Sequence, residues 1–166
     1  VVPRDARRYP QMRPQGHGHI LNTASSAGLT AAGQGTSYGA TTHAVVGMSM
    51  ALRSEAVPRG VGVLVVCPAA VETPILDKGA VGGFVGRDYF LQSQGGKPYN
   101  ADRLARDTLR AIDRNKAILV KPPVAHAQWL FARAAPTLMN RLAMRFVAGQ
   151  RTRQAKGSPS RAVDSG

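Results

Sequence analysis

The sequence predicts an α/β fold of about three parallel strands with flanking helices, followed by a C-terminal helical tail. Short apolar runs at 19–23 and 61–66 enclose a stretch, 38–56, in which apolar residues recur every three or four positions. A second helical stretch and a third apolar run, 117–120, follow later in the chain. Strand, helix and strand joined by short connections form a parallel crossover unit. A chain of 166 residues, 43% hydrophobic, is long enough for one domain with its own core.

The first half of the chain supplies two strands and a helix. Residues 1–18 mix Pro, Gly and Arg without periodicity, so we predict an irregular segment. The run 19–23 is short, apolar and bounded by glycine, as a buried strand would be. The helix at 38–56 ends where Pro58 and Gly60 follow. The β-branched run 61–66 predicts a strand covered on both faces.

The second half supplies a loop, a helix, a strand and the tail. The glycine-rich stretch 79–98 predicts a long loop. Asn100 or Asp102 is expected to cap the next helix, and Asn115 to close it before the strand 117–120. We therefore predict an α/β unit over 19–124, an amphipathic helical tail over 125–149 that is kinked or broken at Pro136, and a disordered end over 150–166.

Composition narrows the class of protein. The net charge is +13, but the basic residues crowd the two ends and only 5% of residues are aromatic, so we do not expect nucleic-acid binding. No run of eighteen apolar residues occurs. The lone Cys67 fits a reducing, cytoplasmic environment and a buried, small apolar role. His17 and His19 lack a third ligand at suitable spacing, so no metal site is predicted.

Ser25 and Tyr38 are the candidate reacting groups. A tyrosine has an ordinary pKa of about 10 and is almost fully protonated at neutral pH. A cation one helical turn away would favour its ionised form and make it a useful acid or base. Thr42 stands one turn after Tyr38, where it can hydrogen-bond a ribose hydroxyl but supplies no charge. His43 lies about 100° further round the helix and is expected to pack or face solvent.

Three motifs resemble the short-chain dehydrogenase/reductase family in order and spacing. They are Asn-Thr-Ala-Ser-x-Ala-Gly at 22–28, Tyr-x-Ala-x-x-His-Ala-Val-x-Gly at 38–47, and Cys-Pro-x-x-Val-x-Thr-Pro at 67–74. The resemblance covers residues 16–76, and residues 100–120 resemble the family more weakly. It implies the C-terminal half of a Rossmann-like, doubly wound parallel sheet. It also implies an oxidoreductase that moves hydride between NAD or NADP and a small-molecule alcohol or carbonyl substrate.

The resemblance also implies roles for five residues. Ser25 would hydrogen-bond the substrate oxygen, and Tyr38 would act as general acid/base beside the cofactor. Pro68, Val71 and Thr73 would lie against the nicotinamide. The Val71 backbone and the Thr73 hydroxyl would bond its carboxamide end or the nearby phosphates.

The sequence departs from the family pattern in several places. Thr42 replaces the family's lysine, and Ala69 replaces a glycine that lets backbone approach the cofactor. The glycine clusters at 16–18, 33–35 and 79–86 lack the strand, glycine turn and helix order of a phosphate-binding loop. The family's early strands are also absent. We therefore expect this chain by itself to bind cofactor weakly and to have impaired activity or none.

A second reading is non-catalytic. The chain would then be a remnant or binding module that meets a partner or an anionic membrane through its basic tail helix. Pocket cover or simple packing by that helix is favoured over a membrane surface. The strand at 20–23 would form an open sheet edge, which favours self-association or a partner that completes the domain.

Overall fold

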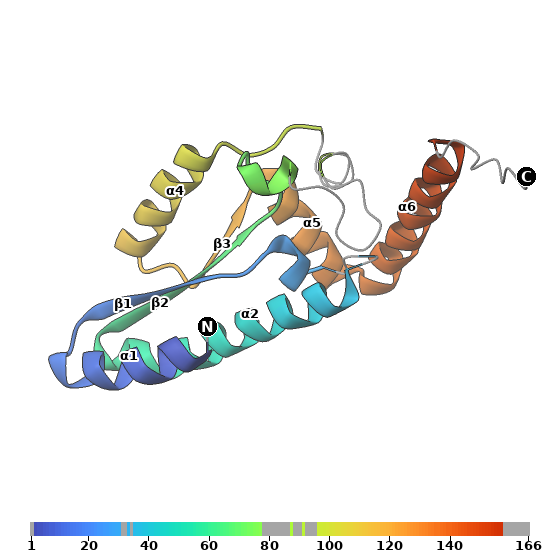
Figure 1. Cartoon of the computed structure of the whole chain (residues 1–166). Coiled ribbons are helices and arrows are strands. Elements are labelled where there is room, and N and C mark those ends of the chain that lie inside the picture. The colour runs from blue at the N-terminus through green and yellow to red at the C-terminus, as the bar shows by residue number, and fades with distance from the viewer. Residues whose placement is uncertain are drawn as a thin grey trace, which may run out of the picture.

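The computed structural model describes residues 2–30, 33, 35–77, 87, 91 and 96–157. Its centre is a three-stranded parallel sheet in the order β1-β2-β3. The strands are β1 (Gly18–Thr23), β2 (Val61–Pro68) and β3 (Ile118–Lys121). The predicted α/β class with three parallel strands is confirmed (Figure 1).

Helices cover both faces of the sheet and extend beyond it (Figure 1). The helices α1 and α2 lie on one face and α4 on the other, because separate apolar clusters join them to the strands. The helix α5 packs against the sheet, where Ala125 contacts a cluster with Cys67 and Val120, and α6 extends away from it (Figure 1). The bounds are α1 (Val2–Gln15), α2 (Thr36–Ala56), α4 (Ala101–Asp113), α5 (Pro123–Ala134) and α6 (Pro136–Gly157), with single turns η1 (Ser26–Gly28), η2 (Val57–Arg59) and η3 (Pro74–Asp77).

The central strand β2 is buried along its length except at Pro68. Val61 and Val63 face the α1–α2 side, where they pack with Ile20 of β1. Leu64 and Val66 face the α4 side. Burial on both faces explains the nearly continuous β-branched run of this strand.

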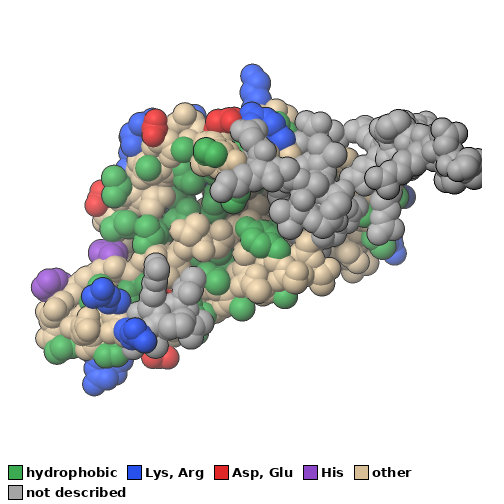
Figure 2. Space-filling model, in the orientation of Figure 1, with side chains coloured by type: hydrophobic (Ala, Val, Ile, Leu, Met, Phe, Trp, Pro, Cys, Tyr) green, Lys and Arg blue, Asp and Glu red, His purple; other side chains and the backbone are tan. Residues whose placement is uncertain are grey.

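The strand β1 is one of the two edge strands of the sheet within the described residues. Its residues alternate between buried and exposed positions. Ile20 pairs with Val63 and is buried, whereas Leu21 pairs with Leu64 and is 46% exposed. The α4 side of the sheet is therefore covered over β2 but open over β1. Figure 2 shows hydrophobic side chains gathered between α4 and the α1–α2 layer on this face.

The prediction of an irregular segment over residues 1–18 was wrong, because residues 2–15 form α1. Pro10 and Pro14 lie inside this helix and argued against it in the sequence. Tertiary contacts offset their cost: Tyr9 and Met12 pack on the cluster around Ile20. The hydroxyl of Tyr9 also donates a hydrogen bond to the Glu55 carbonyl, 3.1 Å away.

A network of three buried polar side chains joins α1, β1 and α2. The Asn22 amide donates to Asp5 Oδ2 at 2.7 Å and to Ser49 Oγ at 3.0 Å. Ser49 Oγ in turn donates to the Val45 carbonyl at 2.7 Å. Asp5, Asn22 and Ser49 are all buried, so Asn22 satisfies a carboxylate that water reaches poorly.

Replacement of Asn22 by leucine is expected to lower the free energy of unfolding by about 2–3 kcal/mol, because the Asp5 carboxylate loses its donor. Urea denaturation measures this loss. Combining Asn22→Leu with Asp5→Ala removes the buried carboxylate that has lost its donor, and should restore part of the stability. An unchanged denaturation midpoint in Asn22→Leu would contradict the role assigned to this network.

The tail is broken at Pro136, as predicted: α5 ends at Ala134 and Pro136 begins α6. The rest of the tail differs from the prediction. The helix α6 continues to Gly157, so the disordered end predicted from residue 150 was wrong over 150–157, and residues 158–166 lie outside the described residues. Its apolar residues are also not gathered on one covered face, since Leu138 and Leu142 are exposed.

Most of the predicted loop at 79–98 lies outside the described residues. Among the helices that are described, none combines the length and apolar character needed to cross a bilayer.

Candidate active site

The three parallel strands end at the same edge of the sheet, and the candidate site begins there. Ala24, just after β1, donates its backbone N–H to the Val66 carbonyl at 2.8 Å. Ala69, just after β2, donates to the carbonyl of Lys121 at the end of β3, also at 2.8 Å. Ligands of open parallel sheets bind outside this carboxyl edge.

Ser25 lies at this edge and caps the turn η1. Its Oγ accepts a hydrogen bond from the Ala27 backbone N–H at 3.2 Å. The same hydroxyl donates to the Pro68 carbonyl at 3.5 Å, which is a long contact. The structure thus brings Ser25 beside Pro68, the first residue of the segment expected to face the nicotinamide. The weak bond leaves the hydroxyl able to turn toward a substrate.

Tyr38 lies in the first turn of α2 and is 53% exposed. Within the described part of the chain, no hydrogen bond engages its hydroxyl. The turn η1 lies directly against α2 at this end: a Cβ added to Gly28 would stand 2.7 Å from the Thr42 carbonyl oxygen. Similarly, a Cβ at Gly39 would meet the Ala27 carbonyl at 3.7 Å. The turn that Ser25 caps and the turn that carries Tyr38 are therefore in contact.

Thr42 is engaged by its own helix. The residue is buried, and its hydroxyl donates to the Tyr38 carbonyl at 2.8 Å, with the Gly39 carbonyl at 3.1 Å. A bond from this hydroxyl to a ribose stays a prediction, and it would require the hydroxyl to turn away from the Tyr38 carbonyl. His43 bonds the Gly39 carbonyl through Nδ1 at 2.8 Å. Neither side chain places a cation beside Tyr38.

The segment after β2 is fixed by a residue that the sequence did not single out, Tyr99. Val71 and Tyr99 form an isolated parallel bridge. Tyr99 donates its backbone N–H to the Ala70 carbonyl at 2.9 Å, and Glu72 donates to the Tyr99 carbonyl at 2.8 Å. The Thr73 hydroxyl donates to the Val71 carbonyl at 3.3 Å. No sequence signal joins positions this far apart.

A cleft of about 620 Å³ adjoins the η1 turn and the first turns of α2. It lies between the start of α2, the η1 turn and α6, so the tail helix walls a cavity next to the site, as pocket cover would require. Neither Ser25 nor Tyr38 lines it, although their near neighbours Ala27 and Gly39 do.

Cys67 is fully buried, which confirms the apolar role predicted for it. Burial raises the pKa of its thiol to about 12. The thiol therefore stays protonated and unreactive at neutral pH. Among the residues that can be described, no group of three potential metal ligands comes together.

Comparison with known proteins agrees with this geometry. A family model described as short chain dehydrogenase matches residues 6–80, which include Ser25, Tyr38 and the segment from Pro68 to Thr73. The short-chain reductase protein NovJ of Streptomyces niveus is 42% identical over 67 residues, 40% of this chain and 25% of NovJ. D-beta-hydroxybutyrate dehydrogenase of Rhizobium meliloti is 36% identical over 69 residues, 42% of this chain and 27% of that protein. The matches thus span about a quarter of the length of these relatives.

Solved structures share the fold. A short-chain dehydrogenase from Streptomyces avermitilis superposes with a TM-score of 0.61 at 23% identity, covering 89% of this chain and 55% of that one. A short-chain dehydrogenase from Sphingobium yanoikuyae in complex with NADPH gives a TM-score of 0.55 at 24% identity, covering 93% and 52%.

The parallel sheet, its helical layers and these superpositions define part of a Rossmann-like α/β fold. Over residues 6–80 the chain is similar to the short-chain dehydrogenases, as the family model and both curated relatives indicate.

Proposed function

We propose that this chain carries the reacting half of an NAD(P)-dependent oxidoreductase site for a small-molecule alcohol or carbonyl substrate. The observation that carries the proposal is the contact between η1 and α2, which sets the Ser25 turn against the Tyr38 turn at the carboxyl edge of the sheet. With these two turns in contact, the exposed phenol of Tyr38 would provide a proton donor and the Ser25 hydroxyl a hydrogen-bond donor for one substrate oxygen.

In the reducing direction, the Ser25 hydroxyl donates a hydrogen bond to the substrate carbonyl oxygen and fixes its position. Tyr38 gives its phenolic proton to that oxygen as the C–O bond becomes an alcohol. A bound reduced nicotinamide supplies the hydride that the carbonyl carbon receives. In the oxidising direction, Tyr38 takes the proton back. Solvent restores its proton between turnovers, because the side chain is exposed.

The segment from Pro68 to Thr73 fits the nicotinamide end of such a cofactor. The segment follows the buried strand β2 at the edge where Ser25 lies. The Val71 backbone N–H meets no acceptor within the described residues, so it is available to a carboxamide oxygen. Thr73 must turn its hydroxyl away from the Val71 carbonyl to do the same. The Sphingobium protein, which shares the fold, is in complex with NADPH, which supports a nicotinamide cofactor for this fold.

Weak cofactor binding and impaired turnover are part of the proposal. In the part of the chain that the structure describes, no cluster of glycines directly follows a strand and opens a helix, as a phosphate cradle would. The buried Thr42 adds no charge near Tyr38. Binding therefore rests on the nicotinamide end alone.

Fluorescence titration of the 166-residue chain with NADH and with NADPH tests whether cofactor binding is weak. We expect dissociation constants of about 1 mM or weaker for both, because only one end of the dinucleotide finds partners. At millimolar cofactor, slow reduction of butane-2,3-dione should be measurable. A micromolar dissociation constant would contradict the proposal that the chain binds the cofactor weakly. If the protein did not speed the reduction of butane-2,3-dione, the proposed oxidoreductase reaction would be contradicted.

The open edge of β1 is a candidate surface for association with a partner or with a second copy of the chain. Within the residues that the structure describes, no strand pairs with the outer edge of β1, and this edge with the exposed Leu21 favours self-association or a completing partner. Sedimentation velocity over a range of protein concentrations distinguishes an associating chain from a monomer. The membrane alternative gains no support, because exposed Leu138 and Leu142 alternate along α6 with exposed Arg141 and Arg145 instead of facing away from them.

A further inference from the structure

Tyr99 connects the proposed cofactor-binding segment to the rest of the domain. Its backbone bonds to Ala70 and Glu72, the two residues that flank Val71. Its ring is buried, 8% exposed. Any displacement of Tyr99 therefore moves the backbone on both sides of Val71.

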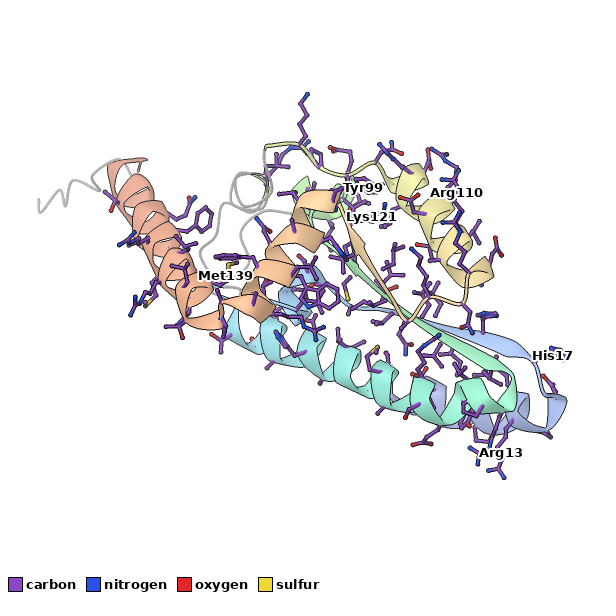
Figure 3. All side chains as sticks on the ribbon, turned by 180° about the vertical axis from the view of Figure 1, so that it is seen from behind. Arg13, His17, Tyr99, Arg110, Lys121 and Met139 are labelled. Carbon is purple, nitrogen blue, oxygen red and sulfur yellow. The ribbon has the colours of Figure 1, made fainter. Side chains whose placement is uncertain are left out.

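The side chain of Tyr99 ends in a polar group that joins three parts of the fold. Its hydroxyl donates to Asp107 Oδ2, on α4, at 2.7 Å. Lys121 Nζ, at the end of β3, lies 3.0 Å from the same oxygen. Arg110 contacts the other carboxylate oxygen at 3.5 Å. Figure 3 shows Tyr99 and Lys121 close together at one end of the sheet, with Arg110 on the neighbouring helix.

Charge reinforces this arrangement. The guanidinium of Arg103 lies 5.6 Å from the centre of the Tyr99 ring, and the ammonium of Lys121 lies 6.0 Å from it. Burial and the hydrogen bond to Asp107 raise the pKa of Tyr99. The hydrogen bonds from Tyr99 and Lys121 lower the pKa of Asp107. At neutral pH the phenol is thus a fixed donor and the carboxylate a fixed acceptor.

We propose that Tyr99, Asp107 and Lys121 form a latch that positions the segment from Ala70 to Thr73 against the nicotinamide end of the cofactor. The latch acts through the backbone: Asp107 holds the phenol, the phenol holds the Tyr99 backbone, and that backbone holds Ala70 and Glu72. Tyr99 and its partners are positioning residues, since none touches the reacting atoms. The cofactor part of this inference rests on the proposed function, whereas the latch itself does not.

Amide hydrogen exchange, followed residue by residue by NMR on the full chain, tests the latch. In Tyr99→Phe, which keeps the ring and removes the hydroxyl, the amides at 72 and 99 should exchange about 10-fold faster or more. Amides of β2, such as that of Val65, should be unaffected. Lys121→Met should also accelerate exchange of the amides at 72 and 99. It replaces Tyr99→Phe as the test variant if Tyr99→Phe folds poorly.

Tyr9→Phe is the matched control. It removes a phenol of a partly buried residue on the α1–α2 side. That phenol donates to the Glu55 carbonyl and accepts a hydrogen bond from Arg59. It should leave the amides at 72 and 99 unchanged. Unchanged exchange at position 72 in Tyr99→Phe, or equal acceleration at Val65, would overturn the latch.

Addition of 10 mM NADPH, an amount about ten times the expected dissociation constant, separates the two proposals. We expect the Val71 and Thr73 amide signals to shift in the wild-type chain and in Tyr9→Phe, and to shift several-fold less in Tyr99→Phe. Equal shifts in all three chains would overturn the positioning role. No shift in the wild-type chain would count against the proposed function, while the exchange rates still decide the latch.

Discussion

Replacement of Tyr38 by phenylalanine is expected to lower the rate of butane-2,3-dione reduction at millimolar NADPH by about 100-fold or more. The proton donor is lost, and positioned acid–base groups contribute roughly 10²–10⁴-fold to such steps. Because the Tyr38 hydroxyl makes no hydrogen bond within the described part of the chain, its removal costs no native interaction there. Rates measured by the loss of NADPH absorbance, against a protein-free blank, give the comparison.

Two controls separate chemistry from folding. The urea midpoint of Tyr38→Phe should match wild type to within about 0.5 kcal/mol, as is usual for exposed positions. Tyr9→Phe removes a phenol elsewhere in the molecule and should keep the wild-type rate. A Tyr38→Phe chain as active as wild type would exclude Tyr38 as the proton donor.

Replacement of Gly28 by alanine is expected to lower the same rate by about 10-fold or more and to destabilise the fold by about 1–3 kcal/mol. The new Cβ would lie 2.7 Å from the Thr42 carbonyl oxygen, 2.8 Å from its carbon and 3.2 Å from the His43 nitrogen. All three are backbone atoms of α2, so the η1 turn must move away. Ser25 then moves away from Tyr38.

Gly47→Ala is the matched control for this change. Gly47 lies within the same helix, and nothing stands within 4 Å of an added Cβ there. Alanine should stabilise the helix by up to about 1 kcal/mol and leave the rate unchanged. Full activity in Gly28→Ala would show that the contact between η1 and α2 does not assemble the site.

The strands and the two main helices could be predicted because their signals are local. The run 61–66 is apolar throughout and becomes the fully covered strand β2. The helix predicted to end before Pro58 ends at Ala56, and Asn100 caps α4 by accepting a hydrogen bond from the Arg103 N–H at 2.9 Å. Each of these features depends on residues a few positions apart.

The errors arose where distant contacts decide the outcome. Two prolines made residues 2–15 look irregular, but packing on Ile20 and the bond from Asn22 to Asp5 hold them in a helix. The helical period put Thr42 on the face of Tyr38, yet it could not show that Gly28 packs against the backbone carbonyl of Thr42. Tyr99 carried no motif, because its role depends on Asp107 and Lys121. The roles of Ser25, Tyr38, Pro68, Val71 and Thr73 stay predictions.

Deuterium transfer tests most directly whether Ser25 and Tyr38 are the reacting pair. The chain would be incubated with millimolar NADPH deuterated at nicotinamide C4 and with butane-2,3-dione, and the alcohol product examined by mass spectrometry. We expect the wild-type chain to place deuterium on the carbinol carbon, and the Ser25→Ala/Tyr38→Phe double variant to give only the protein-free background. Equal labelling by the double variant, or none above background by wild type, would contradict the assignment.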